Sequence, residues 1–363
     1  MHARIGWQNL RTSEFLDSGD YMLITGTDFI DGAVNFDTCH YVERERYEQD
    51  KHIQIRNGSI LITKDGTLGK VAYIQGLTMP ATLNAGVFNV EIKDENEVDN
   101  RYLFQYLKAP FLMDYVDKKA TGGTIKHLNQ NILVDFPVVL PHKAEQEKIG
   151  EYFLAIDHLI TLHQRKYDKL TNVKKSMLEK MFPQNGSNAP EIRFKGFTEA
   201  WEQRKLGDVV DVRSGKDYKH LSEGNIPVYG TGGFMLSVNQ ALSYDEDAIG
   251  IGRKGTIDKP YILKAPFWTV DTLFYAIPRE KVDLNFAFDV FQNIDWKKKD
   301  ESTGVPSLSK TAINEIDVLV PQYDEQQPLG QFFNRIDNLI TLHQRELEKL
   351  KNLKKACLEK MFV

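Results

Sequence analysis

Two stretches of this 363-residue chain are nearly identical, and they constrain its fold more than any other feature. Residues 145–182 and 325–362 align without a gap, and 23 of these 38 positions carry the same amino acid. Chance does not produce such a match, so the repeat indicates an internal duplication. The chain is therefore expected to contain one structural element twice, with different sequence before each copy.

Each copy has the pattern of one long amphipathic helix, because seam residues recur at spacings of four and three, as in a coiled-coil heptad. In the first copy the seam positions are Ile149, Phe153, Ile156, Ile160, His163, Tyr167, Leu170, Lys174, Met177 and Met181. The second copy repeats the pattern from Leu329 to Met361. His163 and its equivalent His343 are interpreted as polar residues that set the helix register, and metal binding is the alternative.

The apolar stripe on both helices is wider than a two-helix seam requires. The additional apolar residues are Tyr152, Leu159, Leu162, Val173, Phe332, Leu339, Leu342 and Leu353. A pair of helices would leave this flank in water, so we expect helices of a partner to cover it. Packing against the chain's own domains is the alternative.

The segments before the helices contain short β-rich runs separated by Gly and Pro, which is typical of strands joined by turns. They diverge from each other, yet a skeleton recurs in both. TKDGTLGK (63–70) matches GRKGTIDK (252–259), and the run 120–141 matches 301–321. The expected order is a domain at 1–142, a helical spacer at 143–183, a linker and second domain at 184–322, and a second helical spacer at 323–363.

The expected fold class is α+β, with two α/β domains separated by two long helices. One helix leads from the first domain to the second, and the other must return if the chain is to be compact. The two helices are therefore expected to pack antiparallel, with pseudo-two-fold symmetry. The halves differ at one end, because residues 194–212 have no counterpart before MHARIGWQNL. The first domain is expected to lack this segment, through truncation or because another part of an assembly fills the gap.

The recurring glycine loops are the candidate binding site. Glycine allows backbone N–H groups to approach a phosphate closely, and nearby Lys and Arg supply the charge that phosphates attract. Asn can pair with adenine and Arg with guanine. An ordinary solvated turn is the alternative. The candidate DNA-binding residues are Arg4, Lys64, Thr67, Lys70, Lys126, His127, Asn129, Lys216, Arg253, Lys254, Thr256, Lys259, Ser307 and Lys310.

Other site types find little support in the sequence. Gly250-Ile-Gly252-Arg-Lys-Gly255 has the spacing of a dinucleotide loop, but Pro260 follows where that motif needs a helix. Two cysteines give neither a disulfide framework nor a metal pair, which fits a reducing cytoplasm. A net charge of −5 means that a DNA partner would need local basic patches. No catalytic or metal residues are assigned.

The organisation resembles the specificity subunit of Type I restriction–modification systems. The motifs that carry the resemblance are the repeated EQ…IDxLITLHQR…KLxxxKKxxLEKMF, the segment FTEAWEQRKLGD (197–208), and a TG…L…P run before each helix. The resemblance covers nearly the whole chain. It implies two target recognition domains, each of which reads one half of a split DNA sequence, and helices that pack against two methyltransferase subunits.

The resemblance also implies which components the chain would leave to others. Restriction subunits would join the full complex, and S-adenosylmethionine, Mg²⁺ and ATP would be bound by partner subunits rather than by this chain. Because the two helices are expected to pack antiparallel, they would act as a ruler between two half-sites read in opposite orientations. Two alternatives remain, a coiled-coil adaptor that does not contact DNA and a nuclease that acts alone.

Overall fold

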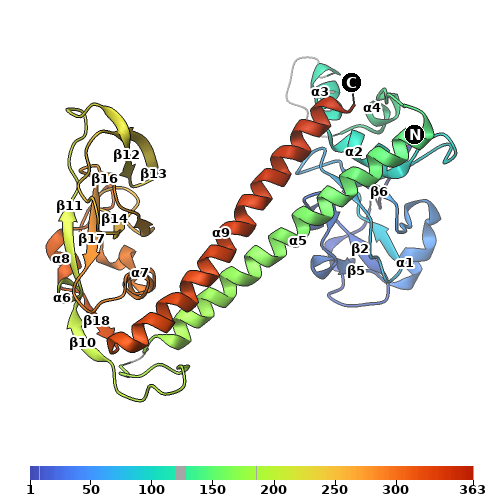
Figure 1. Cartoon of the computed structure of the whole chain (residues 1–363). Helices are drawn as coiled ribbons and strands as arrows, with labels where there is room; N and C mark the ends of the chain where they lie inside the picture. The colour runs from blue at the N-terminus through green and yellow to red at the C-terminus, as the bar shows by residue number, and fades with distance from the viewer. Residues whose placement is uncertain (8, 120–127, 185, 363) are drawn as a thin grey trace. The chain divides into compact units, whose positions relative to one another are not determined.

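The computed structural model describes all residues except 8, 120–127, 185 and 363. The chain divides into two units, Met1–His163 with Glu346–Val363, and Gln164–Arg345. Helices α5 (Lys143–Met181) and α9 (Tyr323–Lys360) are both divided between the two units (Figure 1). Each unit therefore consists of a β-rich part and a piece of both repeated helices.

The first unit is built on an antiparallel four-stranded sheet with the order β1-β9-β6-β7. A second sheet has the order β5-β2-β8, in which β2 and β8 are parallel, and β3 and β4 form a hairpin. The strands are β1 (His2–Ile5), β2 (Met22–Ile24), β3 (Phe29–Ile30), β4 (Ala33–Val34), β5 (His40–Tyr41), β6 (Ile60–Thr63), β7 (Val71–Tyr73), β8 (Ala81–Leu83) and β9 (Val87–Glu91). The helices are α1 (Arg44–Gln49), α2 (Asn100–Lys108), α3 (Phe111–Lys119) and α4 (Gln130–Asp135), with short 3₁₀ turns η1 (Thr12–Glu14), η2 (Gly26–Asp28), η3 (Phe36–Thr38) and η4 (Lys51–Ile53).

The second unit repeats this plan in a different sequence. Its main sheet has the order β11-β17-β14-β15, which matches β1-β9-β6-β7 strand for strand, and its second sheet has the order β13-β12-β16. The strands are β10 (Glu202–Lys205), β11 (Val210–Ser214), β12 (Glu223–Gly230), β13 (Gly233–Val238), β14 (Ala248–Gly252), β15 (Tyr261–Leu263), β16 (Trp268–Thr269), β17 (Leu273–Pro278) and β18 (Asp317–Val320). The helices are α6 (Leu206–Val209), α7 (Leu284–Asn293) and α8 (Lys310–Asn314), with the 3₁₀ turn η5 (Trp296–Lys299). The duplication expected from the helices therefore extends to the domains.

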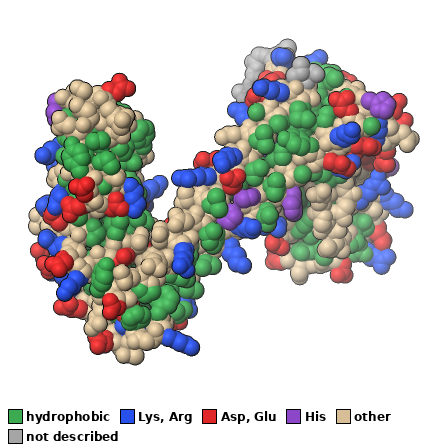
Figure 2. Space-filling view, in the orientation of Figure 1, with side chains coloured by type: hydrophobic (Ala, Val, Ile, Leu, Met, Phe, Trp, Pro, Cys, Tyr) green, Lys and Arg blue, Asp and Glu red, His purple; other side chains and the backbone are tan. Residues whose placement is uncertain are grey.

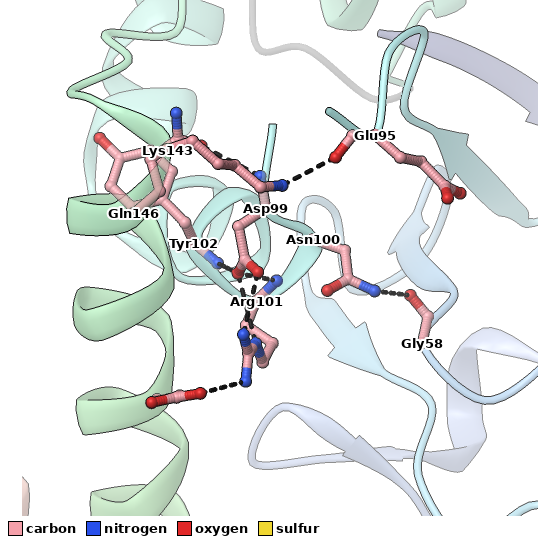
Figure 3. Close-up of polar contacts among 9 residues, drawn as sticks. Gly58, Glu95, Asp99, Asn100, Arg101, Tyr102, Lys143 and Gln146 are labelled. Atoms are coloured by element: carbon pink, nitrogen blue, oxygen red, sulfur yellow. Dashed lines mark hydrogen bonds and ion pairs between the residues drawn. The ribbon is translucent and has the colours of Figure 1, made fainter. Parts of the chain in front are cut away.

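A capped helix joins each main sheet to the repeated helices. In the first unit the Asp99 carboxylate accepts the N–H groups of Arg101 and Tyr102, at 2.9 and 3.0 Å, and so begins α2. The guanidinium of Arg101 also donates to Glu151 of α5 at 2.9 Å, and Gln146 of α5 accepts the N–H of Asp99 at 3.0 Å (Figure 3). These contacts fix the angle between α5 and the sheet that α2 covers.

The second unit uses the same contacts at equivalent positions. Asp283 caps α7, and Gln326 of α9 accepts the N–H of Asp283 at 3.0 Å. Gly330 lets the two helices approach closely, because a Cβ atom there would lie 2.6 Å from the backbone nitrogen of Phe286. Gly150 has the same role against α2. The repeated Gln and Gly residues thus hold a helix of the β-rich part in both halves.

The two repeated helices pack antiparallel in both units. In the first unit Phe153 of α5 stacks on Phe362, which follows α9, with ring centroids 5.6 Å apart. In the second unit the equivalent pair is Phe333 of α9 and Phe182, with centroids 6.1 Å apart. The predicted α+β fold class with two antiparallel helices is confirmed. The predicted seam is buried or half-buried along both copies, except that Met361 is 39% exposed.

The two-stranded sheet of β10 and β18 in the second unit has no equivalent among the described residues of the first. Strand β10 pairs with β18 and buries Val318 and Val320. The equivalent segment of the first unit, residues 136–141, is in no strand, and its Val139 and Leu140 are 58% and 43% exposed. Residues 136–141 therefore present two apolar side chains to solvent in the first unit.

Candidate nucleic-acid interface

Two loops that are distant in the sequence form the centre of the candidate site in the second unit. The loop after β14 carries Arg253, whose carbonyl accepts the N–H of Leu308 at 2.9 Å. Lys254 forms a bridge pair with Ser307. A cleft of about 440 Å³ lies between these loops, and Asp271 and Thr272 complete its lining. The structure thus brings together two motifs that the sequence singled out separately.

The first unit makes the equivalent junction. The carbonyl of Lys64 accepts the N–H of Leu128 at 3.0 Å, as that of Arg253 accepts the N–H of Leu308. Lys70 is exposed, and its backbone N–H donates to the hydroxyl of Thr63 at 2.9 Å. The predicted residues Lys126 and His127 lie outside the described residues. The exposed Asn129 precedes α4, on the chain segment that enters this junction.

One end of the main sheet adds a further cation in the second unit. Strands β11 and β14 both pair with β17, so the residues that follow β11 and β14 lie at the same end of the sheet as those that precede β17. The N–H of Lys216 donates to the carbonyl of Thr269 at 2.9 Å, and the N–H of Arg253 donates to that of Thr272 at 2.8 Å. Lys216 and Arg253 therefore lie on either side of the turn formed by residues 270–272.

The prediction that backbone N–H groups of the glycine loops bind phosphate is wrong for two of the glycines. The N–H of Gly69 donates to the carbonyl of Thr63, and the N–H of Gly255 donates to that of Pro306, so neither is available to a phosphate. Gly69 and Gly255 have φ angles of +75° and +95°, which strongly favour glycine. Glycine is thus required here by the turns, and the exposed side chains carry the charge.

The remaining predicted residues are placed as follows. Thr67 and Thr256 are exposed at the loops, Lys259 is exposed at the end of the second loop, and Lys310 is exposed at the first residue of α8. Arg4 is exposed within β1, opposite Asn89 of β9, rather than at the loop junction. Arg4 is therefore the least central of the described candidates.

The first unit places an aromatic residue where the second has Lys216. The N–H of Trp7 donates to the carbonyl of Leu83 at 3.0 Å, in the way that Lys216 donates to Thr269. The guanidinium of Arg46 lies 5.8 Å from the centre of the Trp7 ring. Trp7 and Arg46 escaped the sequence analysis because only the backbone pairing reveals this equivalence.

Two lysine runs beside the loops were also missed. Lys297, Lys298 and Lys299 lie in η5, shortly before the loop that contains Ser307. The side chains of Lys297 and Lys298 are 76% and 81% exposed. Lys297 pairs with Asp258 at 3.0 Å, and this contact lowers the pKa of the Asp258 carboxyl and ties η5 to the other loop. In the first unit Lys118 and Lys119 are exposed at the end of α3, just before the matching run. The sequence feature that could have identified both runs is the presence of adjacent lysines shortly before each TG run.

The predicted partner face of the helices is exposed in both units, apart from Phe332, and Figure 2 shows hydrophobic side chains along the helices. Its members range from 36% exposed at Val173 to 51% at Leu342. Phe332 corrects the prediction, because it is half-buried, with the Phe194 ring of the linker 6.2 Å away. The linker therefore covers part of one of the eight predicted residues.

Two other kinds of site find no support within the described ranges. No helix there has a stretch long and apolar enough to cross a membrane. No group of three or more His, Cys, Asp or Glu side chains is placed to hold a metal in the same part of the chain.

Comparisons with known proteins place this chain among its relatives. A family profile described as "Type I restriction modification DNA specificity domain" matches residues 8–172 and 198–352. The chain is 25% identical over 349 residues to the Type I restriction enzyme MjaVIII specificity subunit of Methanocaldococcus jannaschii, covering 84% of this chain and 78% of that protein. The putative MjaX specificity subunit of the same organism is 24% identical over 90% of this chain and 82% of its own length. The crystal structure of a Type I restriction–modification S subunit from M. genitalium has the same fold, with a TM-score of 0.75 and 18% identity over 99% of this chain and 93% of that one.

Proposed function

Because this chain belongs to the family of Type I restriction modification DNA specificity domains, we propose that it reads a bipartite double-stranded DNA target, one half-site with each unit. The chain is a specificity subunit, so its role is DNA recognition and not catalysis. The observation that supports a bipartite target is the double construction of the interface. The carbonyl of Lys64 and the carbonyl of Arg253 each hold an equivalent loop, within sheets of the same strand order.

The exposed cations of each loop pair supply the attraction to DNA. Phosphate contacts position a protein on the duplex, whereas side chains that reach base edges determine the sequence. In the second unit Lys254, Lys259 and the lysines of η5 are exposed around the loops, and Arg253 is held by a bond to the Asp271 carbonyl at 3.3 Å. We assign phosphate contacts to the lysines and base or phosphate contact to Arg253.

The exposed helical face supplies the partner interface in this proposal. Leu159 in the first unit and Leu339 in the second are equivalent repeat positions, and they are 42% and 45% exposed. Two methyltransferase subunits would dock on these faces, one on each, and restriction subunits would complete the assembly. S-adenosylmethionine, Mg²⁺ and ATP would be bound by those partners. The complex would act on DNA in the cytoplasm.

The experiment begins with the target. Methylome sequencing of a host that expresses the chain with its methyltransferase gives both half-sites. Binding of the purified complex to a labelled duplex of that sequence is then measured over a range of salt concentrations. Arg253→Ala and Lys259→Ala should weaken binding, whereas Lys195→Ala, which removes an exposed linker lysine, is the matched control.

The two kinds of contact predict different results. Loss of a phosphate contact should weaken binding to all sequences and reduce the slope of log affinity against log salt by about 1. Loss of a base contact should cost about 1–3 kcal/mol and relax specificity at one position. Unchanged affinity of both variants at every salt concentration would remove the loops from the interface. Cleavage by the chain alone with Mg²⁺ would instead identify a nuclease, and partner binding without DNA binding would identify an adaptor.

A further inference from the structure

The hairpin of β12 and β13 presents two apolar side chains to solvent at its tip. Gly230 pairs with Gly233, so Thr231 and Gly232 alone form the turn. The next two residues, Phe234 and Met235, are 63% and 49% exposed. Phe234 is the most exposed large apolar side chain in the described part of the chain. Exposed apolar side chains that gather on one projection are candidates for a contact surface.

A bulge determines where these side chains point. Val228 pairs with Leu236 but Tyr229 pairs with Phe234, so Met235 is an additional residue on its strand. Such bulges redirect side chains next to functional sites. The hairpin is held close to its turn, because the Tyr261 hydroxyl donates to the carbonyl of Gly230 at 2.6 Å. The tip is therefore a defined projection.

The hairpin tip lies beside the cations of the candidate interface. The N–H of Val270 donates to the carbonyl of Tyr229 at 3.0 Å, and Val270 begins the turn that separates Lys216 from Arg253. A Cβ atom on Gly230 would lie 3.5 Å from Val270 and 2.8 Å from the sulfur of Met235. Figure 2 shows hydrophobic side chains gathered over the β12–β13 part of the second unit, with Lys and Arg side chains close to them.

This combination identifies the chemistry of the partner. Lys216 and Arg253 beside the tip favour a polyanion over an apolar protein surface. The major groove of B-DNA admits a two-stranded β-ribbon, and its edges carry one apolar group, the C5-methyl of thymine. Phe is a side chain that contacts this methyl group, and Met adapts readily to an apolar partner.

We propose that the β12–β13 hairpin enters the major groove of the half-site read by the second unit, where Phe234 and Met235 recognise the C5-methyl group of a thymine. This inference rests on the proposed function and names two specificity-determining residues for it. In the first unit β2 pairs with β5 only through Met22 and Leu23. The short hairpin of β3 and β4 between them is held against β7 and α2, because the N–H of Tyr73 donates to the carbonyl of Gly32 at 2.9 Å and the ammonium of Lys108 donates to the carbonyl of Asp31 at 2.8 Å. Methyl recognition of this kind is thus assigned to one half-site.

The test removes the methyl group and changes nothing else in the DNA. The full chain, assembled with its methyltransferase, is titrated with duplexes of the mapped target in which single thymines are replaced by deoxyuridine. One or two substitutions, all in one half-site, should weaken binding about fourfold, which corresponds to ~0.8 kcal/mol for one buried group of this size. Substitutions in the other half-site should have no comparable effect.

The protein variants complete a double-mutant cycle with the DNA. Phe234→Ala should bind the thymine duplex more weakly and should no longer distinguish thymine from deoxyuridine at the sensitive position. Phe234→Leu, which keeps an apolar side chain, should retain part of the discrimination. Met235→Ala should reduce the discrimination. Equal amide exchange at β14 and β17 in all variants checks that the second unit remains folded.

The outcomes separate this inference from the proposed function. A complex that does not bind its mapped target specifically refutes both. Specific binding without any effect of deoxyuridine, or a half-site without an A·T pair, refutes the thymine contact alone. Discrimination that persists unchanged in Phe234→Ala and Met235→Ala also refutes it. A discrimination lost in Phe234→Ala with β14 and β17 still protected supports it.

Discussion

In each unit a buried ion pair joins α5 and α9. Replacing the acid should destabilise the first unit more than replacing the lysine, and in the second unit the lysine should matter more than the acid. In the first unit Asp157 of α5 pairs with Lys354 of α9 at 2.5 Å. In the second unit the equivalent pair is Asp337 of α9 and Lys174 of α5. The pairs are identical by duplication, so any difference in behaviour must come from the surrounding residues.

The two pairs have different ionisable neighbours. In the first unit the Asp157 carboxylate lies 3.8 Å from the ammonium of Lys108 and accepts from Gln105 at 2.9 Å, so two cations share one acid. In the second unit the position equivalent to Gln105 is Asp289, which is almost fully buried with one carboxyl oxygen that has no hydrogen-bond partner.

Lys108 is replaced by an amide in the second unit. There Gln292 takes the equivalent place and accepts from Lys174 at 2.6 Å. One cation therefore serves two acids, Asp337 and Asp289, in the second unit.

These arrangements set the expected magnitudes in the first unit. Asp157→Asn leaves two cations without an acid, and removal of one partner from a buried pair costs ~3–5 kcal/mol. Because Asp157 is 22% exposed at its side chain, the lower end of that range applies. Lys354→Met keeps the apolar stem and leaves Asp157 with Lys108 and Gln105, so about 1 kcal/mol is expected.

The order reverses in the second unit. Lys174→Met leaves Asp337 and Asp289 without a cation, which should cost about 3 kcal/mol. Asp337→Asn leaves Lys174 with Asp289, which can then ionise, so the expected cost is about 1 kcal/mol.

The pH dependence provides a second check on the first unit. Burial, followed by the neighbouring Lys108, lowers the pKa of Lys354 to about 7, from its ordinary value of 10.5. The unfolded chain therefore binds more protons than the folded chain between about pH 7 and 10.5, and Lys354 makes stability rise with pH in this window. The cost of Asp157→Asn should accordingly decrease above pH 7, where Lys354 can lose its proton.

Amide hydrogen exchange is the appropriate assay, because a chain of two units need not unfold in one step. Protection at α2 reports the first unit, and protection at α7 reports the second. The acid variant should lose more protection in the first unit and the lysine variant more in the second. The same order in both units, or equal losses within each pair, would refute the reasoning.

Three further predictions concern the partner face, the buried acid and the spacing of the target. Leu159→Asp with Leu339→Asp should release the methyltransferase while α2 and α7 stay protected, and undiminished co-purification would contradict this. Burial raises the pKa of Asp289 well above 3.8. The contribution of its protonated carboxyl to folding stability is therefore complete below pH 3.8 and is lost as pH rises through the folded-state pKa. The free energy of unfolding of Asp289→Asn should accordingly increase relative to that of the wild type as pH rises. Four residues inserted after both Lys169 and Lys349 add about one helical turn of ~6 Å to each helix and should lengthen the unspecified spacer by one or two base pairs, whereas an active variant that methylates the original spacing would contradict a ruler.

The sequence by itself determined the repeated helices, their seam and the exposed apolar face. Local periodicity is sufficient for this, because a residue's side of a helix follows from its spacing alone. The antiparallel pairing was also accessible, since the chain must return after α5. The β-rich halves were recognisable as related from the loops that match around Gly66 and Gly255, but their strand order was not.

Tertiary structure alone decided which residues meet at the candidate interface. Lys216 and Arg253 come together because strands β11 and β14 both pair with β17, and Ser307 joins them through its bridge to Lys254. No sequence spacing encodes these pairings. The same pairing places Trp7 at the position of Lys216. It also showed that the amides of Gly69 and Gly255 are already bonded. Hydrogen-bond partners are a property of the folded backbone, so the sequence indicated which loops matter but not which of their atoms are free to bind.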